Sequence, residues 1–244
     1  MDRHNEIYTQ KIVNLMIRRR KELGISQSEL ARRAGVPQST IARIETHKLH
    51  IRLDTLMKIM AVLNCDLSFV NNERFETKRL ILRKYKIEDA QAMFDGWCSD
   101  PEVAKYVTWN PHQNVEETKI LLTSWIDQYN NPDAIRYGIC LKDSEMLIGS
   151  IDVVGYRDGN PEIGYCLSKN HWNHGYMTEA LEAMTKHLFL LGFNKIVIAA
   201  ATDNIASNRV IEKCGFIFTH QEQKELKKAS KTNLIIVNWY ELIK

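Results

Sequence analysis

The hydrophobic period of the chain changes near residue 72, and this change limits the possible folds more than any other feature. From Ile12 to Leu63 apolar residues recur three and four positions apart, as on one face of an α-helix, without the alternation of a strand. After residue 72 short β-rich runs alternate with helical stretches. One helical bundle or one sheet does not give both patterns. We therefore expect an all-α domain over residues 1–72 and an α/β domain with a mixed central sheet over residues 73–244.

The composition is that of a globular protein. Of the 244 residues 44% are hydrophobic and 26% are charged, which excludes a wholly disordered or fibrous chain. No apolar run approaches the roughly 20 residues of a membrane span, and residues 1–5 lack the apolar core of a signal peptide. The five cysteines are scattered without a Cys-x-x-Cys pair, which argues against a zinc site and a disulfide framework. We expect a cytoplasmic protein with no membrane segment and no metal.

Charge is divided unevenly between the two halves. Residues 1–72 hold 12 Lys and Arg against 7 Asp and Glu, whereas the rest of the chain holds 21 against 23. A basic module joined to a nearly neutral one suggests a polyanion binder attached to a domain with another task. A solvated helical surface can be equally basic, so the charge alone leaves both interpretations open.

Start and stop signals divide the first domain into short helices. Ser26 is placed to cap a helix, and Glu29 three residues later completes a capping box. Gly35 stands where two helices must turn sharply, a position that tolerates a positive φ angle. Pro37 suits the first position of the following helix, where its missing N–H costs nothing. Two short helices with a glycine turn between them describe a helix-turn-helix.

The stretch over residues 23–45, LGISQSELARRAGVPQSTIARIE, resembles the phage-repressor/Cro-type helix-turn-helix family, and the likeness extends to about Val70. The family usually follows its last glutamate with Asn-Gly, whereas Glu45 is followed here by Thr46 and His47. Histidine can adopt a left-handed turn at some cost. The resemblance implies binding to double-stranded DNA, usually by a dimer that reads two half-sites about 34–36 Å apart. We therefore expect a homodimer.

In this family the second helix lies in the major groove and turns its N-terminal side chains toward the base edges. The side chains expected to contact bases are those of Gln38, Ser39, Thr40 and Arg43. Gln27 opens the preceding helix and is expected to donate to a phosphate. The alternative is that residues 38–40 are only a polar helix start.

The second domain is expected to alternate strands and helices around one sheet. The predicted strands span residues 80–83, 136–141, 147–154, 162–167, 195–201 and 234–240. The predicted helices span residues 87–97, 115–129, 176–191 and 205–213. A turn carrying Gly175 joins the strand at 162–167 to a helix. Such a junction gathers free main-chain N–H groups and favours a phosphate, although many glycines before helices serve packing alone.

The segments over residues 161–180, PEIGYCLSKNHWNHGYMTEA, and 204–216, NIASNRVIEKCGF, together resemble the GCN5-related N-acetyltransferase (GNAT) superfamily, particularly its ribosomal-protein N-acetyltransferase branch. Residues 77–83, TKRLILR, and 99–106, SDPEVAKY, are also similar to that branch. The likeness covers roughly residues 76–244. It implies a GNAT fold and transfer of acetyl from acetyl-CoA, as cosubstrate, to an amine acceptor whose identity stays open.

The resemblance also implies the cofactor contacts. The main chain at the glycine turn is implied to hold the pyrophosphate of coenzyme A, and Asn204 to contact its pantetheine arm. The positions expected to line the cofactor are Tyr165, Cys166, His174, Gly175, Tyr176, Met177, Thr178, Asn204 and Ser207. Two positions depart from the usual pattern, since Trp172 stands where the superfamily has Gln or Arg and Met177 where Gly or Ala is usual.

Direct attack of an amine on a thioester needs a proton acceptor, donors for the developing oxyanion, and a proton for the leaving thiolate. Glu162 is the candidate base, because the family often has a carboxylate there that acts through water; its alternative is a solvated residue at a strand entrance. Main-chain N–H groups of residues 164–166 are the candidate oxyanion donors. Many members have an acidic Tyr where this chain has Ile211, so Ser207 is the candidate acid, with a simple cofactor contact as its alternative.

These features predict a protein with two activities, a DNA-binding transcriptional regulator joined to an N-acetyltransferase. Two alternatives stay open. The GNAT domain of a regulator can serve only to sense CoA or another ligand. A GNAT toxin that acetylates a charged tRNA or a ribosomal component can carry a DNA-binding module as its own repressor.

Overall fold

The computed structural model describes residues 3–48, 51–64, 74–131, 134–228 and 231–244. The chain divides into two compact units, a helical unit built mainly from residues 1–71 and an α/β unit built from the residues that follow. The predicted boundary between residues 72 and 73 lies outside the described residues.

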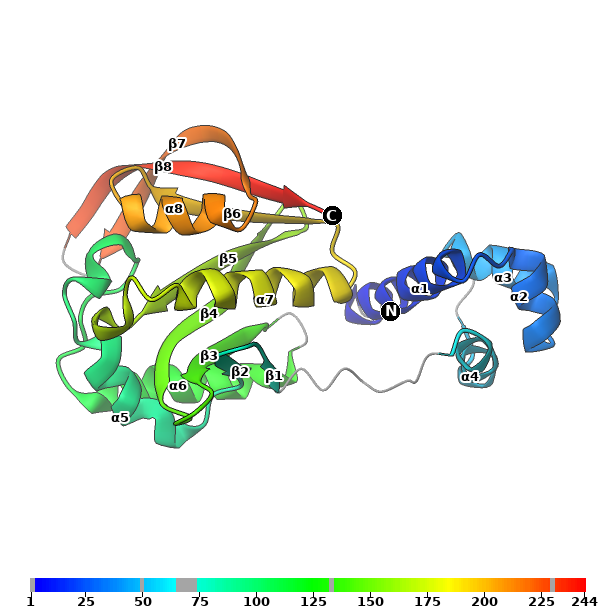
Figure 1. Ribbon diagram of the computed structural model, residues 1–244, viewed down its shortest axis with the longest axis horizontal. Coiled ribbons are helices and arrows are strands. Elements are labelled where there is room, and N and C mark those ends of the chain that lie inside the picture. Colours follow the sequence, from blue (N-terminus) through cyan, green and yellow to red (C-terminus); the bar gives the residue numbers. More distant parts are fainter. Residues whose placement is uncertain (1–2, 49–50, 65–73, 132–133, 229–230) are drawn as a thin grey trace. The chain divides into compact units, whose positions relative to one another are not determined.

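The helical unit is all-α over its described part, as predicted. It contains α1 (Arg3–Glu22), α2 (Gln27–Ala34), α3 (Gln38–Glu45) and α4 (Leu53–Val62), labelled in Figure 1. Their apolar faces meet in a core whose fully buried members include Leu30, Ile41, Ile44 and Ile59. These residues belong to the three- and four-residue spacing of the sequence, because that spacing places them on the inward face of each helix.

The junction of α2 and α3 confirms some of the local signals and corrects others. The Ser26 Oγ atom accepts the Glu29 N–H at 3.1 Å, and Gly35 has φ 65°. The predicted capping box is wrong, because the Glu29 carboxylate accepts from Arg32 and Arg33 and not from the main chain of Ser26. Two nearby guanidinium groups bind this carboxylate in place of one amide.

Pro37 and His47 lie at the two ends of the second helix of the motif, α3. Pro37 is the N-cap residue of α3 and not its first helical residue, since its φ and ψ of −59° and 141° are non-helical. His47 has φ 57°, the left-handed conformation that the departure from Asn-Gly requires. The chain thus makes the family's turn with an imidazole side chain.

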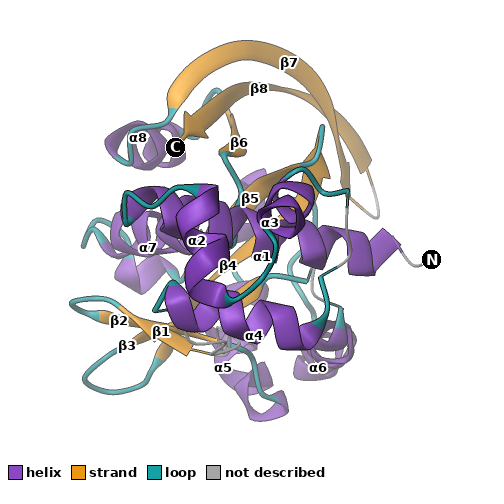
Figure 2. Cartoon of the chain, turned by 90° about the vertical axis from the view of Figure 1, so that its right-hand side faces the viewer, coloured by secondary structure: helices purple, strands orange, loops and turns teal. Residues whose placement is uncertain are grey.

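The α/β unit is built on one mixed sheet, as predicted. Its described strands are β1 (Arg74–Glu76), β2 (Leu80–Arg83), β3 (Arg136–Leu141), β4 (Leu147–Arg157), β5 (Asn160–Leu167), β6 (Lys195–Ala201), β7 (Ile217–Lys228) and β8 (Lys231–Ile243). Their order is β1-β2-β3-β4-β5-β6-β8-β7. The pair β5–β6 is parallel and the other neighbours are antiparallel. Figure 2 shows the long β7–β8 hairpin, which bends strongly along its length.

Helices cover both faces of this sheet. The longer ones are α6 (Val115–Asp127), α7 (Tyr176–Leu190) and α8 (Ile205–Lys213), and α5 (Ala90–Met93) is a single turn. Helix α7 packs on the face that carries Tyr137, whereas α5 and α6 close the opposite face around Ile81 and Cys140. Figure 1 shows α7 crossing the sheet.

The predicted helix over residues 87–97 is wrong in its type. A 3₁₀ turn (Ile87–Asp89), α5 and a π-helical turn (Phe94–Cys98) follow one another there. The wide last turn is closed by Ser99, whose N–H and Oγ both donate to the Phe94 carbonyl, at 3.2 and 2.7 Å. This geometry places the Trp97 side chain in the core, where it is 1% exposed. The helix predicted over 115–129 likewise ends as a 3₁₀ turn (Gln128–Asn130).

Candidate functional site

The sheet opens between β5 and β6. Strand β5 pairs with β4 from Asn160 to Leu167, but its described pairs with β6 are only Glu162↔Val197 and Ile163↔Ile198. The last four residues of β5 therefore face a gap on the β6 side. An extended ligand can hydrogen-bond to such a strand edge as a further strand does.

The turn that precedes α7 places a helix N-terminus just after this gap. Gly175 has φ 77°, and a Cβ atom at this position would meet only the Arg79 Nη2 atom, at 3.5 Å. Because α7 begins at Tyr176, the N–H groups of its first three residues have no acceptor within the helix. The first bond of the helix runs from Glu179 N to Gly175 O at 3.1 Å. An open glycine beside free N–H groups suits an anion such as a pyrophosphate.

Side chains from the β1–β2 connection hold this turn in place. The Glu179 carboxylate accepts from the Thr77 hydroxyl at 2.6 Å and from the Arg79 main chain and Nε at 2.8 and 2.7 Å. The Arg79 Nη1 atom donates to the His174 carbonyl at 3.0 Å. Burial alone would raise the pKa of Glu179, but the hydrogen bonds from Thr77 and Arg79 together lower it, so the carboxyl is ionised. This network was not predicted from the sequence.

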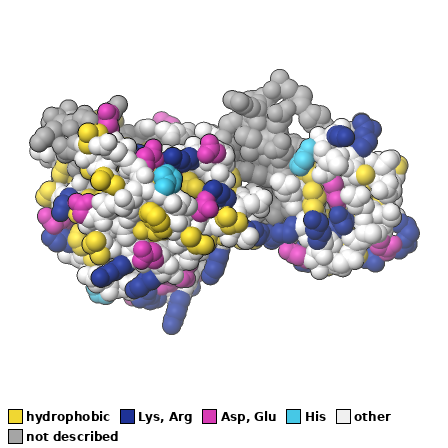
Figure 3. Space-filling view, turned by 90° about the horizontal axis from the view of Figure 1, so that it is seen from above, with side chains coloured by type: hydrophobic (Ala, Val, Ile, Leu, Met, Phe, Trp, Pro, Cys, Tyr) yellow, Lys and Arg dark blue, Asp and Glu magenta, His cyan; other side chains and the backbone are white. Residues whose placement is uncertain are grey.

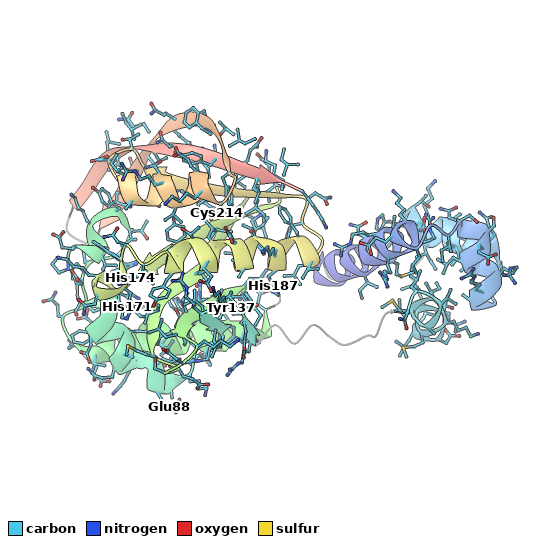
Figure 4. The ribbon with its side chains drawn as sticks, in the orientation of Figure 1. Glu88, Tyr137, His171, His174, His187 and Cys214 are labelled. Carbon is cyan, nitrogen blue, oxygen red and sulfur yellow. The ribbon has the colours of Figure 1, made fainter. Side chains whose placement is uncertain are left out.

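Aromatic and imidazole rings gather on the same turn. The Arg79 guanidinium lies over the Tyr176 ring, 4.6 Å from its centroid, and the His174 ring stacks on Tyr176 at 5.7 Å. Figure 4 shows His171 and His174 at the beginning of α7. The buried His171 Nδ1 atom has no hydrogen-bond partner among the described residues, and burial and then the neighbouring His174 lower its pKa. A neutral imidazole with a free ring nitrogen is thus available at the turn.

The two departures from the family pattern leave the turn intact. The Met177 side chain is buried, 6% exposed, and so points into the unit. The Trp172 indole Nε1 donates to the Leu167 carbonyl at 2.8 Å, which ties the turn to the end of β5. A bulky side chain at either position therefore belongs to the packing of the turn.

The structure brings together Tyr165, Asn204 and Ser207, three of the positions expected to line the cofactor, and their contact with the cofactor stays a prediction. Asn204 is the N-cap of α8, and its Oδ1 atom accepts the Ser207 N–H at 3.2 Å. The Ser207 Oγ atom lies 2.8 Å from the Tyr165 hydroxyl. Burial raises the pKa of Tyr165, although the hydrogen bond to Ser207 favours the phenolate. Two hydroxyl groups thus share one hydrogen bond beside the open end of β5, a pairing that the sequence analysis did not predict.

Glu162 lies in the short part of β5 that pairs with β6. Its partners across the sheet are Gly155 in β4 and Val197 in β6. Its side chain is 20% exposed and its Oε1 atom lies 3.5 Å from the Lys224 Nζ atom. The carboxylate is therefore on the sheet face near the gap, with a cation at hand and partial access to water.

The thiols near the gap are protonated. Burial raises the pKa of Cys214 to about 12, and its Sγ atom donates to the Thr178 carbonyl at 3.6 Å. Burial also raises the pKa of Cys166 well above its usual range. Since a thiolate is the reactive form, neither thiol is suited to carry an acyl group. No three His, Cys, Asp or Glu side chains of the described residues lie close enough together to hold a metal ion.

A second polar group of residues lies on the opposite side of β4 from α7, around Asp152, which the sequence offers only as a weaker candidate for the acceptor side. Asp152 is 8% exposed at the middle of β4, and its cross-strand neighbour in β3 is Arg136. The Ser150 hydroxyl lies 3.1 Å from both oxygens of Asp152. The only sequence signal was an acidic residue within a strand of aliphatic residues.

In the helical unit the predicted base-contacting side chains lie on α3. Gln38, Ser39 and Arg43 are exposed and Thr40 is half-buried, whereas Ile41 is 1% exposed. Figure 3 shows Lys and Arg side chains on the visible face of the helical unit. The exposed face of α3 is thus polar and free to meet a ligand, and its base contacts stay a prediction.

Gln27 takes part in a network that joins three helices. Arg20 donates from Nε and Nη2 to the two oxygens of Glu45 at 2.7 and 2.9 Å, and the Gln27 Nε2 atom donates to Glu45 at 2.7 Å. Burial alone would raise the pKa of Glu45, but the hydrogen bonds from Arg20 and Gln27 lower it. One amide N–H of Gln27 is thus engaged within the unit, and its contact with a phosphate stays a prediction.

Comparison with protein families gives a match for each unit. Residues 79–217 match the acetyltransferase (GNAT) domain, and residues 16–70 match a helix-turn-helix domain. An uncharacterized N-acetyltransferase, p20 of Bacillus licheniformis, is 30% identical over 177 residues, which cover 70% of this chain and 97% of that protein. An uncharacterized HTH-type transcriptional regulator of Haemophilus influenzae is 42% identical over 59 residues, which cover 24% of this chain and 60% of that protein.

Solved structures share the fold of the α/β unit. RimL, a ribosomal L7/L12 α-N-protein acetyltransferase, has been solved in complex with coenzyme A. It is similar with a TM-score of 0.61 and 22% identity, covering 70% of this chain and 98% of that one. None of the described helices of this chain is both long and apolar enough to cross a membrane.

Proposed function

Because the chain belongs to the GNAT acetyltransferase family and is an acetyl-CoA-dependent N-acetyltransferase with a helix-turn-helix domain, we propose that it has two activities. The α/β unit transfers the acetyl group to a primary amine, and the helical unit binds double-stranded DNA and regulates transcription. The protein acts as a homodimer in the cytoplasm.

One observation carries the enzymatic half of this proposal. The ladder between β5 and β6 ends at Ile163, and the free N-terminus of α7 follows at Gly175 and Tyr176, after the end of β5 and a 3₁₀ turn (Lys169–His171). Free N–H groups at a helix N-terminus favour the pyrophosphate of coenzyme A, and the open edge of β5 can take the extended pantetheine arm. The thioester then lies beside Tyr165, whose main-chain N–H is the oxyanion donor. The Ser168 N–H donates to the Ile148 carbonyl in β4, and because N–H directions alternate along a strand, the Tyr165 N–H points to the open side of β5.

The side chains around the gap suit a direct transfer. When bound, acetyl-CoA supplies an activated acetyl group. Glu162 accepts a proton from the acceptor through water, consistent with its partial exposure next to Lys224. The Tyr165–Ser207 pair supplies a proton to the leaving sulfur, since its two hydroxyl groups are 2.8 Å apart and the raised pKa of Tyr165 keeps the phenol protonated.

Calorimetry and a thiol-release assay test this half. The full chain is titrated with CoA and acetyl-CoA, and thiol release is then followed with a panel of primary amines. Binding together with amine-dependent thiol release is the expected result. Tight binding without turnover would instead identify the GNAT unit as a sensor, and no binding would refute the enzymatic half. A toxin would arrest growth on expression and lose this effect on disruption of Asn204 and the Gly175 turn.

The DNA-binding half predicts that Gln38→Ala and Arg43→Ala each weaken operator binding by about 1–3 kcal/mol, because each removes a bidentate base contact. Fluorescence anisotropy with operator and scrambled duplexes at fixed salt measures this loss. Lys58→Ala removes an exposed cation from α4 and is the control, since a charge effect weakens binding to both duplexes equally. Unchanged operator affinity in both α3 variants would rule out this recognition helix.

A further inference from the structure

Five side chains form a polar cluster on the face of the sheet that α6 covers. Asp152 and Ser150 come from β4, Arg136 from β3, Tyr85 follows β2, and Trp125 comes from α6. The Arg136 guanidinium lies 4.3 Å from the centre of the Trp125 ring, and Tyr85 packs on the same ring at 5.5 Å. We call these five residues the Asp152 cluster.

Several polar atoms of the Asp152 cluster are buried without a partner. The Nε and Nη1 atoms of Arg136 and the hydroxyl of Tyr85 make no hydrogen bond within the described part of the chain. Tyr85 is 4% exposed. The distance from Arg136 Nε to the Asp152 Oδ2 atom is 3.8 Å, too long for a hydrogen bond. Because each unsatisfied buried donor costs about 1–3 kcal/mol, this arrangement calls for a ligand or another partner.

The Asp152 cluster adjoins the proposed site of acetyl transfer. Asp152 lies opposite Gly164 in β5, and Ser150 lies opposite Cys166. Gly164 is the first residue of β5 beyond its last described pair with β6. Neighbouring strands are about 4.8 Å apart, so Asp152 is one strand spacing from β5 and about two, roughly 10 Å, from a thioester on the open edge of β5.

The charges of the Asp152 cluster restrict the class of ligand that it can bind. Arg136 and Asp152 carry opposite charges but are not hydrogen-bonded to each other, and their side chains are only 16% and 12% exposed. A lone cation would leave one positive charge in excess among these buried groups, and a lone anion one negative charge. A small zwitterion leaves the balance unchanged, since its ammonium pairs with Asp152 and its carboxylate with Arg136.

We propose that the Asp152 cluster is the acceptor site and that it binds an α-amino acid. Asp152 takes the ammonium group, and Arg136 and the Tyr85 hydroxyl take the carboxylate. This inference rests on the proposed acetyltransferase function and identifies the class of its acceptor. Acetylation removes the positive charge of the amine, so the product loses its pairing with Asp152 and is released.

The site is expected to work best above neutral pH. Burial raises the pKa of Asp152 to about 7, although Arg136 and Ser150 favour its ionised form. The other titratable groups near it are Tyr85 and Tyr129, whose pKa values are raised by burial and by Asp152, and the thiol of Cys166. All three stay neutral near pH 7, so Asp152 is the group that changes charge. The KM for the amino acid should therefore rise as the pH falls below about 7.

The test compares amino acids with matched amines. Thiol release is measured with each of the twenty common L-amino acids, with the amide of each one that reacts, and with the amine that lacks its carboxylate, such as L-alanine, L-alaninamide and 2-aminopropane. We expect kcat/KM to be at least about 10-fold higher for the amino acid than for either analogue, about 1.4 kcal/mol. An amide or amine that reacts equally well would overturn the inference.

Variants separate this inference from the proposed function. Asp152→Asn and Arg136→Gln should raise the amino-acid KM about 10-fold or more without changing the affinity for CoA, and Glu162→Gln should lower kcat instead. Arg74→Gln, on the exposed strand β1, is the matched control and should change neither. Calorimetry of amino acids with the full chain, with and without CoA, gives a readout that needs no turnover. Binding of CoA without binding or turnover of any amino acid overturns this inference alone, whereas loss of CoA binding refutes the proposed function.

Discussion

The turn before α7 and the Asp152 cluster are both polar, but they are satisfied in opposite ways. At the turn the side chains of Thr77, Arg79 and Glu179 bind one another, and the N–H groups of the main chain remain free. In the Asp152 cluster the strand residues Arg136, Ser150 and Asp152 have their main chain paired within the sheet, and side-chain atoms of Arg136 and Tyr85 remain free.

The difference indicates how each region recognises its ligand. A pyrophosphate is symmetric and highly charged, and a rigid set of main-chain N–H groups binds it without any specific side chain. An acceptor must be distinguished from other amines, which requires donors and acceptors that only one ligand completes. Under the proposed function, satisfied side chains therefore support the cofactor turn, whereas unsatisfied side chains form the acceptor site.

The largest expected effect concerns the buried carboxyl group of the Asp152 cluster. Its pKa is raised from 3.8 to about 7, so between these pH values the folded chain holds a proton that the unfolded chain releases. The free energy of unfolding therefore falls by about 4 kcal/mol as the pH rises through this range, and the loss is complete above pH 7. Asp152→Asn should remove this loss, so its stability relative to the wild type should rise with pH.

Urea unfolding at pH 5 and pH 8, followed by tryptophan fluorescence, measures this change. All five tryptophans belong to the α/β unit, so the signal reports on that unit. Glu76→Gln is the control, because hydrogen bonds from Lys142 and Arg74 lower the pKa of Glu76 below 4.5, so the charge of this group does not change between pH 5 and pH 8. A difference between wild type and Asp152→Asn that does not change with pH would contradict the prediction.

The next effect concerns the glycine of the cofactor turn. Gly175→Val should weaken CoA binding about 100-fold, about 2.7 kcal/mol, because a β-branched residue strongly disfavours φ 77° and the turn must change. Gly159→Val is a matched control, since Gly159 has the same φ in the β4–β5 turn and nothing lies within 4 Å of its position. Isothermal titration with CoA compares the two variants. Equal losses in both would show that the turn has no special part in binding.

The smallest effect compares two tyrosines, the half-buried Tyr165 and the buried Tyr85. Tyr165→Phe removes a hydroxyl that is bonded to Ser207, and it should lower the free energy of unfolding by about 1 kcal/mol. Tyr85→Phe removes a hydroxyl without a partner among the described residues, so it should leave stability unchanged or raise it by up to about 1 kcal/mol. Urea unfolding of both variants at one pH measures the difference. A loss in Tyr85→Phe equal to that in Tyr165→Phe would mean that the Tyr85 hydroxyl has a partner in solution.

The predictions from sequence succeeded where the signal is local. The Gly35 turn, the Ser26 cap and the helix predicted over residues 205–213 each depend on residues within a few positions of one another. They failed where distant groups compete, as at Glu29, whose carboxylate binds two arginines and not its own helix start. The π-helical turn at residues 94–98 is a similar case, because the burial of Trp97 is a property of the whole core.

The amino-acid sequence by itself determined the two-domain organisation, the helix-turn-helix, the mixed α/β fold and the glycine turn before α7. Hydrophobic periodicity and turn formation depend on residues that are neighbours in the chain. Only the tertiary structure decided that Tyr85, Arg136 and Asp152 meet on one face of the sheet. These residues are far apart in the chain, and the register of β3 and β4 and the packing of α6 bring them together. Whether a buried polar group has a hydrogen-bond partner depends on that register. No local sequence pattern predicts this outcome.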